Sequence, residues 1–169
     1  MRGNAMNASP AHSTLLSPSP VFPLIALPSS LIALMDWKLE VVVVPVSDVD
    51  RAKQFYSEQV GFNVDVDHQP NDQFRVVQLT PPGSGCSVTI GKGLIDSAPG
   101  SLKGLQLVVS DVEAARAQLA ERGVDVTPVR YMEDGVWKDG HGGPWNSFVF
   151  FKDPDGNSWA VQEKPDPAA

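Results

Sequence analysis

The feature that most constrains the fold is a tetrapeptide that occurs twice. Ser47-Asp48-Val49-Asp50 returns as Ser110-Asp111-Val112-Glu113. Each copy follows an apolar run typical of a strand and precedes an amphipathic segment that ends at a glycine, Gly61 or Gly123. Serine and aspartate side chains accept hydrogen bonds from first-turn N–H groups of a helix, and an acidic residue complements its positive end. The motif therefore predicts a duplicated strand–helix unit.

Alternating and apolar runs after each helix extend the repeat to strand, helix and three strands. The predicted helices cover 48–59 and 111–122, and the predicted strands cover 39–46, 63–67, 74–79, 86–90, 105–109, 124–126, 148–151 and 158–162. The pattern favours an α+β fold of two tandem βαβββ units, 36–92 and 104–164. A linker over 93–103 joins them, 131–146 is expected to be a long loop, and 165–169 a frayed tail.

Residues 1–35 differ from the rest of the chain. They hold five prolines, six serines and no acidic residue. Their apolar run is too short and too often broken by proline to span a membrane. We expect a disordered tail, or the product of an upstream start codon with Met35 as the natural first residue, and a targeting role is the alternative.

The net charge limits the classes of partner that fit this chain, and the cysteine content indicates its redox compartment. The formal net charge is −7, which argues against nucleic acid and anionic membranes as partners. A single cysteine, Cys86, excludes a disulfide framework and fits a reducing cytoplasm.

Three motifs carry a resemblance to a known family. V-S-D-V-D-R-A-x-x-F-Y ends at Tyr56, P-P-G-S-G-C-S ends at Ser87, and D-P-D-G-N-S-W ends at Trp159. Together they resemble the vicinal oxygen chelate superfamily of glyoxalases, bleomycin-resistance proteins and extradiol dioxygenases. The second motif is similar to a branch known as glyoxalase family proteins. The resemblance implies that the two units curl their strands into one cup-shaped cavity.

The resemblance also implies four metal-ligand positions, which are Val41, Thr89, Gly104 and Ala160 in this chain. Their side chains lack the imidazole and carboxylate donors that divalent cations need. We therefore expect no metal and no cofactor. His141 lies in a glycine-rich loop, where a mobile polar loop is expected and chelation is the alternative.

Strand alternation predicts which side chains face the cup. Arg75 and Gln78 share a strand, and only one face of it can look inward; Arg75 either pairs with an anionic ligand or lies on the surface. Trp137 and Trp145 belong to the long loop and would either close over a ligand or plug the open end of the cup. The predicted ligand-binding residues are Val41, Arg75, Gln78, Ser87, Thr89, Gln106, Trp137, His141, Trp145 and Ala160.

These observations favour a metal-free small-molecule-binding protein of the bleomycin-resistance type, with an aromatic or amphipathic ligand. The alternative is an enzyme, either a glyoxalase-like lyase or isomerase or a ring-cleaving dioxygenase, with relocated metal ligands or metal-free acid–base chemistry. A homodimer is expected, because the unit edges leave unpaired strands that natural proteins cover.

Overall fold

The computed structural model describes residues 35–165. Two predictions lie outside these residues. They are the tail over 1–35, of which only Met35 is described, and the fraying after Pro165. The chain divides into two units, residues 1–36 and 37–169. All the helices and strands of the described residues belong to the second unit, and none of these helices is long and apolar enough to cross a membrane.

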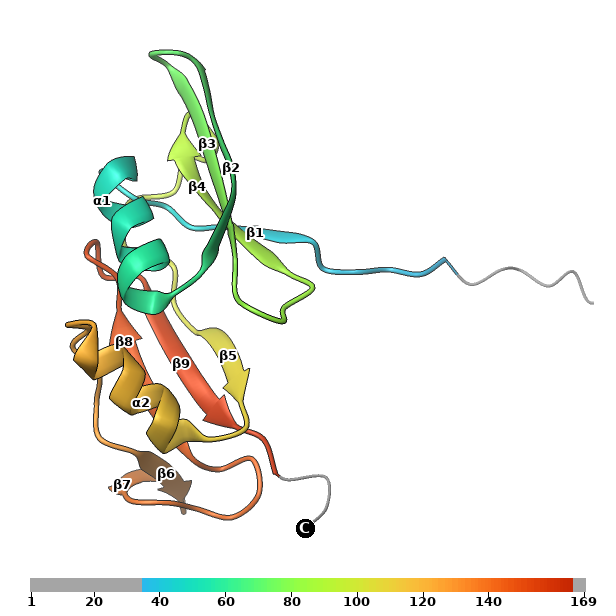
Figure 1. The fold of residues 1–169 in the computed structure, drawn as a ribbon. Coiled ribbons are helices and arrows are strands. Elements are labelled where there is room, and N and C mark those ends of the chain that lie inside the picture. The colour runs from blue at the N-terminus through green and yellow to red at the C-terminus, as the bar shows by residue number, and fades with distance from the viewer. Residues whose placement is uncertain (1–34, 166–169) are drawn as a thin grey trace, which may run out of the picture. The chain divides into compact units, whose positions relative to one another are not determined.

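The first repeat forms a four-stranded sheet with one helical segment on it (Figure 1). Its sheet has the order β1-β4-β3-β2, in which β1 is parallel to β4 and the other pairs are antiparallel. The elements are β1 (Val41–Val43), α1 (Val49–Gln54), the π-helix η1 (Phe55–Val60), β2 (Asn63–Asn71), β3 (Phe74–Thr80) and β4 (Ser87–Lys92).

The second repeat has the same order with one strand added at the outer edge. Its sheet runs β5-β9-β8-β6-β7, and β5 is parallel to β9 as β1 is to β4. The elements are β5 (Leu105–Val109), α2 (Val112–Glu121), β6 (Arg130–Glu133), β7 (Val136–Asp139), β8 (Phe148–Lys152) and β9 (Ser158–Glu163). The α+β fold of two tandem units is confirmed.

The two repeats are equivalent residue by residue at the helix start. Asp48 accepts a hydrogen bond from the N–H of Arg51, and Asp111 accepts one from Ala114, each three residues on. The parallel strand pairs match as well, since Thr89 lies beside Val43 and Ala160 beside Gln106. The duplicated tetrapeptide is therefore a pair of helix N-caps, as expected.

One core joins both repeats. α1 packs on β4, and α2 packs on β8 and β9. Each sheet buries the face under its helix and leaves the other face less covered, which we call the open face of that sheet. The buried residues of both sheets belong to one cluster, which includes Val77, Leu79, Val88, Ile90, Val149, Phe151, Trp159 and Val161.

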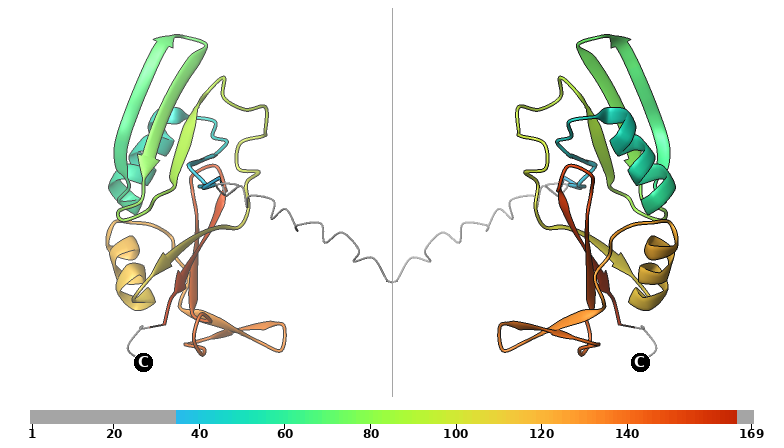
Figure 2. Two further views of the ribbon diagram at one scale, coloured as in Figure 1. Left: turned by 90° about the vertical axis from the view of Figure 1, so that its right-hand side faces the viewer. Right: turned by 90° about the vertical axis from the view of Figure 1, so that its left-hand side faces the viewer.

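Some predicted boundaries were wrong. The loop expected over 131–146 contains the β6–β7 hairpin, which projects on the side of the sheet away from α2 (Figure 2). β2 extends through the turn expected after 67, because pairing with β3 continues to Asn71 and Phe74. The strand expected over 124–126 is a single bridge between Val126 and Phe151.

Candidate ligand-binding site

The open face of the first sheet carries a chain of polar side chains. The Gln78 amide donates to the Ser87 hydroxyl at 3.4 Å, and the Ser87 and Thr80 hydroxyls lie 2.6 Å apart. Thr80 in turn donates to the Asp65 carboxylate. Thr89 pairs with Gln78 across the strands and points to the same face. We call these five residues the hydroxyl patch. Ser87 and Thr89 are each only 7% exposed, so the patch presents donors and acceptors to a polar ligand mainly through the half-buried Gln78 and Thr80 and the exposed Asp65.

The open face of the second sheet is aromatic instead. Trp137 on β7 meets Phe148 and Phe150 on β8 edge to face, with ring centroids 5.4 and 5.0 Å apart. Phe148 and Phe150 stack at 6.1 Å. All three are half-buried rather than enclosed. These three rings form an apolar aromatic patch, in which the indole stands nearly perpendicular to the two phenyl rings, and such a surface suits a ring-containing ligand.

The segment around Trp145 is tied to the same face. Gln106 on β5 donates to Gln162 on β9 at 2.5 Å, and the Gln162 amide donates to the Trp145 carbonyl at 2.6 Å. Trp145 has φ of 61°, a left-handed conformation that costs a non-glycine residue energy, and its side chain is 50% exposed. The hydrogen-bonded glutamines thus hold the strained backbone of Trp145 beside this face and leave its indole half exposed.

A hollow of about 780 Å³ opens beside β9. Its walls include Gly104, Phe150, Ser158 and Ala160, together with residues 125–128. All of them belong to the second repeat. Two of the family's metal-ligand positions, Gly104 and Ala160, therefore line a hollow, and Phe150 of the aromatic patch forms part of the same wall.

Arg75 is directed away from the hydroxyl patch. Its guanidinium binds both carboxylate oxygens of Asp67, at 2.9 and 3.0 Å, and reaches Asp50 of α1 at 2.8 Å. It therefore lies on the helix-covered face, while Gln78 takes the open face. The expectation that Arg75 meets an anionic ligand needs correction, because two carboxylates already occupy its donors.

Two carboxylates that are bound by arginine, Asp67 and Asp155, predict that the folded protein loses stability in acid. Hydrogen bonds from Arg75 and Lys53 hold the pKa of Asp67 well below its usual range. Burial raises the pKa of Asp155, but hydrogen bonds from Ser47 and Arg51 outweigh it and lower the value. A lowered folded-state pKa contributes stability that is present above the unfolded value of about 4 and lost as pH falls below it.

We therefore expect the melting temperature to fall as the pH drops from about 4 toward 2, and to fall less steeply for Asp67→Asn. Thermal unfolding across this range measures the effect. Asp134→Asn, in the exposed turn between β6 and β7, is the matched control. Parallel curves for wild type and Asp67→Asn would contradict the assignment.

His141 lies beside α2. Its Nε2 is 3.2 Å from the Glu113 carboxylate, and both side chains are about half exposed. Among the described residues, no group of three or more His, Cys, Asp or Glu is placed to hold a metal ion. The contact with Glu113 accounts for the position of His141 without a ligand.

The family's metal positions do not fit a metal in this chain. Val41 pairs with Ser87 on the first sheet, and Ala160 pairs with Gln106 on the second. Thr89 and Gly104 complete the set, and none of the four carries an imidazole or carboxylate.

A chelator should leave the stability of the protein unchanged, because no residue at these positions can bind a divalent cation strongly. The expected result is a melting temperature that stays the same with and without EDTA. Metal analysis of protein purified without chelator is the companion measurement. About one metal ion per chain, or a large loss of stability with EDTA, would overturn the expectation.

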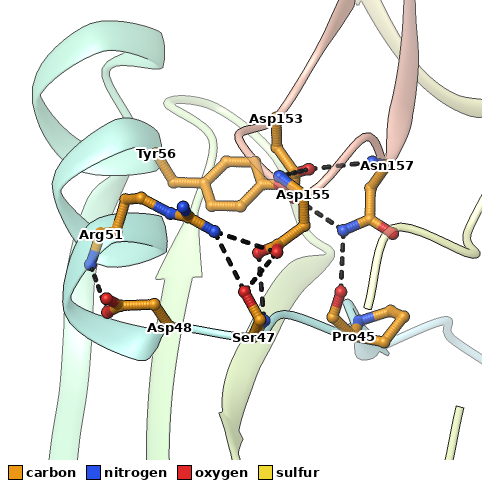
Figure 3. A network of polar contacts seen from close by, with 8 residues as sticks. All are labelled: Pro45, Ser47, Asp48, Arg51, Tyr56, Asp153, Asp155 and Asn157. Carbon is orange, nitrogen blue, oxygen red and sulfur yellow. Dashed lines mark hydrogen bonds and ion pairs between the residues drawn. The ribbon is translucent and has the colours of Figure 1, made fainter. Parts of the chain in front are cut away.

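A polar network joins the two repeats (Figure 3). The Asp153 carboxyl accepts from the Tyr56 hydroxyl at 2.8 Å and from the Asn157 amide at 2.7 Å. Asn157 also donates to the Pro45 carbonyl at 2.9 Å. Burial, followed by the charge of Asp153, raises the pKa of Tyr56, which keeps its hydroxyl a donor. The D-P-D-G-N motif therefore links the repeats, and its Asp153 also lines the hollow beside β9.

Phe148 and Phe150 are not among the ligand-binding residues predicted from the sequence. Alternation along β8 would have placed Phe150 on the open face, because it pairs with Ala160. The hairpin also had a signal: Asp134-Gly135 has φ of 51° and 78°, the two-residue turn that Asp-Gly favours. That turn predicts a hairpin, with Trp137 on its second strand instead of in a loop; β6 separates this strand from β8.

The fold and the open faces define a class of protein built from two tandem βαβββ units. The profile of the Glyoxalase/Bleomycin resistance protein/Dioxygenase superfamily matches residues 38–161, and the chain belongs to this family. The resemblance found in the three motifs is confirmed.

Among solved structures, the chain is similar to TnmS3, an antibiotic binding protein from Streptomyces sp. CB03234. The identity is 36%, the match covers 76% of this chain and 97% of that one, and the TM-score is 0.62. A superfamily member from Sphaerobacter thermophilus DSM 20745 is 30% identical, with 78% and 100% covered and a TM-score of 0.62. The uncharacterized protein YetH of Bacillus subtilis is 27% identical over 124 residues, covering 72% of this chain and 94% of YetH.

Proposed function

We propose that this protein binds an aromatic or amphipathic small molecule on its open faces without a metal ion. The observation that carries the proposal is the aromatic patch, where Trp137, Phe148 and Phe150 present half-buried rings beside a hollow. Rings of a ligand would stack on this surface, and the hydroxyl patch would bind its polar groups. The similarity to an antibiotic binding protein supports small-molecule binding. The lone cysteine fits the cytoplasm as the compartment.

Trp137→Ala should weaken ligand binding by about 1–3 kcal/mol, because the indole forms one wall of the aromatic patch. A thermal-shift screen of aromatic compounds supplies a ligand, and calorimetry then measures its affinity for both forms. The substitution should change the free energy of unfolding less than the free energy of binding, because the indole is partly exposed in the folded protein.

Val136→Ala is the matched control for this experiment. Val136 precedes Trp137 on β7, alternates to the other face and is 59% exposed. It should leave affinity unchanged. Unchanged affinity in Trp137→Ala together with a large loss of stability would make Trp137 a packing residue and remove the main support for the proposed site.

We further propose that the protein forms a homodimer. Apolar side chains remain exposed on the open faces, with Val41 at 39%, Val66 at 43%, Phe74 at 37% and Val108 at 50%. All nine residues of the edge strand β2 are exposed as well. A second copy would cover the strand edge and these four side chains, none of which belongs to the aromatic patch, so the patch would stay open to a ligand. Sedimentation equilibrium measures the state, and a monomer at high concentration would contradict the proposal.

A further inference from the structure

A groove between the two repeats lies apart from both patches. Its volume is about 270 Å³, and its apolar walls are formed by Phe62, Pro81 and Pro82 of the first repeat and by Leu107, Leu119 and Val161 of the second. We call it the inter-repeat groove. None of the residues of the hydroxyl or aromatic patch lines it.

The groove has a single charged residue at its wall. Arg122, which follows α2, is the only Asp, Glu, Lys or Arg among its described lining residues, and Gln118 adds one amide. The chain as a whole carries 20 acidic and 13 basic residues. Arg122 also borders a neighbouring hollow that Glu58 lines, but no acidic side chain lines the groove itself, so the groove wall is locally attractive to an anion.

The Arg122 guanidinium lies against the backbone of Gly61. A Cβ at Gly61 would come within 2.5 Å of Arg122 Nη1, and Gly61 has φ of 92°, so glycine allows this close approach. Nη1 donates to the Val60 carbonyl at 3.5 Å, at the end of η1. Nη2 lies farther from the Gly61 position and has no acceptor among the described residues.

Other arginines of the chain are already occupied. Arg51, Arg75 and Arg130 each form an ion pair with an aspartate, and Arg116 donates to the Thr127 carbonyl. Within the described part of the chain, Arg122 forms no ion pair with a carboxylate. Its donors are therefore available to a carboxylate whose apolar tail lies along the groove.

We propose that the inter-repeat groove binds a small amphipathic carboxylate through Arg122. The carboxylate would accept from the guanidinium, and a short hydrocarbon tail would displace water from the proline and leucine walls. This site is independent of ligand binding at the open faces.

Hexanoate is the probe, titrated into ¹⁵N-labelled protein. In NMR spectra of the protein, saturable chemical-shift changes are expected at the backbone amides of Gly61, Leu107 and Leu119. Hexylamine, with a similar tail and the opposite charge, should bind at least about tenfold more weakly, since a charge-assisted hydrogen bond contributes about that factor. Arg122→Gln should raise the hexanoate Kd about tenfold, while its melting temperature verifies that it folds.

Two control variants test whether binding is specific to this groove. Arg130→Gln removes an exposed, ion-paired arginine outside the groove and should leave hexanoate binding unchanged. Trp137→Ala should also leave it unchanged, so failure at the open faces is distinguishable from failure here. The proposal is overturned if no saturable shift occurs at the groove amides, if hexylamine binds as well as hexanoate, or if Arg122→Gln retains wild-type affinity.

Discussion

Asp153→Ala should lower the free energy of unfolding by about 3–5 kcal/mol, because it removes the shared acceptor of the inter-repeat network. Asp153 is 5% exposed, and its carboxyl satisfies the Tyr56 hydroxyl, the Asn157 amide and the backbone N–H groups of Asp155 and Asn157. Alanine leaves these buried donors without a partner. For a chain of this size the melting temperature should fall by about 10 °C or more, as scanning calorimetry can measure.

Two further variants show whether the loss comes from the network. Tyr56→Phe removes one donor and leaves the carboxyl with its other partners, so about 1–2 kcal/mol is expected. Asp139→Ala removes a carboxylate that is 77% exposed and pairs with Arg130, and it should cost less than about 1 kcal/mol. Equal losses in Asp153→Ala and Asp139→Ala would show that the buried network contributes little.

Trp159→Ala should be comparably destabilising, by about 3–5 kcal/mol, because it empties the centre of the shared core. Trp159 is 3% exposed. Its ring lies 5.8 Å from Tyr56, 5.8 Å from Phe62 and 6.0 Å from Phe151, and its Nε1 donates to the Tyr56 hydroxyl at 3.1 Å. Removing the indole leaves a cavity that these rings cannot fill without moving. Urea unfolding measures the loss.

Trp145→Ala is the matched control, because the same side chain is deleted where it is 50% exposed. A loss of less than about 1 kcal/mol is expected there. Trp159→Phe should fall between the two, since it keeps much of the apolar contact but loses the hydrogen bond to Tyr56. If Trp159→Ala cost no more than Trp145→Ala, the core would be centred elsewhere.

The duplicated architecture was predictable because its signals are local. A capping aspartate, an apolar stripe and a terminal glycine act within one helix, so Asp48 and Asp111 could be read without any partner. Alternation put Gln78 and Arg75 on opposite faces of one strand, but it did not predict which of the two faces looks inward. It could not say that Asp50 and Asp67 neutralise Arg75, because one of them lies on a helix and the other on a neighbouring strand.

The candidate site was predicted only in part, for the same reason. Trp137 was selected from its residue type, but its contacts with Phe148 and Phe150 depend on the fold of the β6–β7 hairpin. The resemblance identified the four metal positions, and their side chains alone argued against a metal.

Local sequence was therefore sufficient to predict the repeat, the ends of its helices and the alternation of side chains along its strands. Only the tertiary structure decided which distant groups meet: Tyr56 with Asp153, Pro45 with Asn157, and Arg122 with the end of η1. Helix capping and strand alternation act over a few residues, whereas these contacts join groups that are 97, 112 and 62 positions apart in the chain. Such contacts form only after both repeats have packed on one core, because the entropy of bringing distant segments together is offset by burial of the whole cluster.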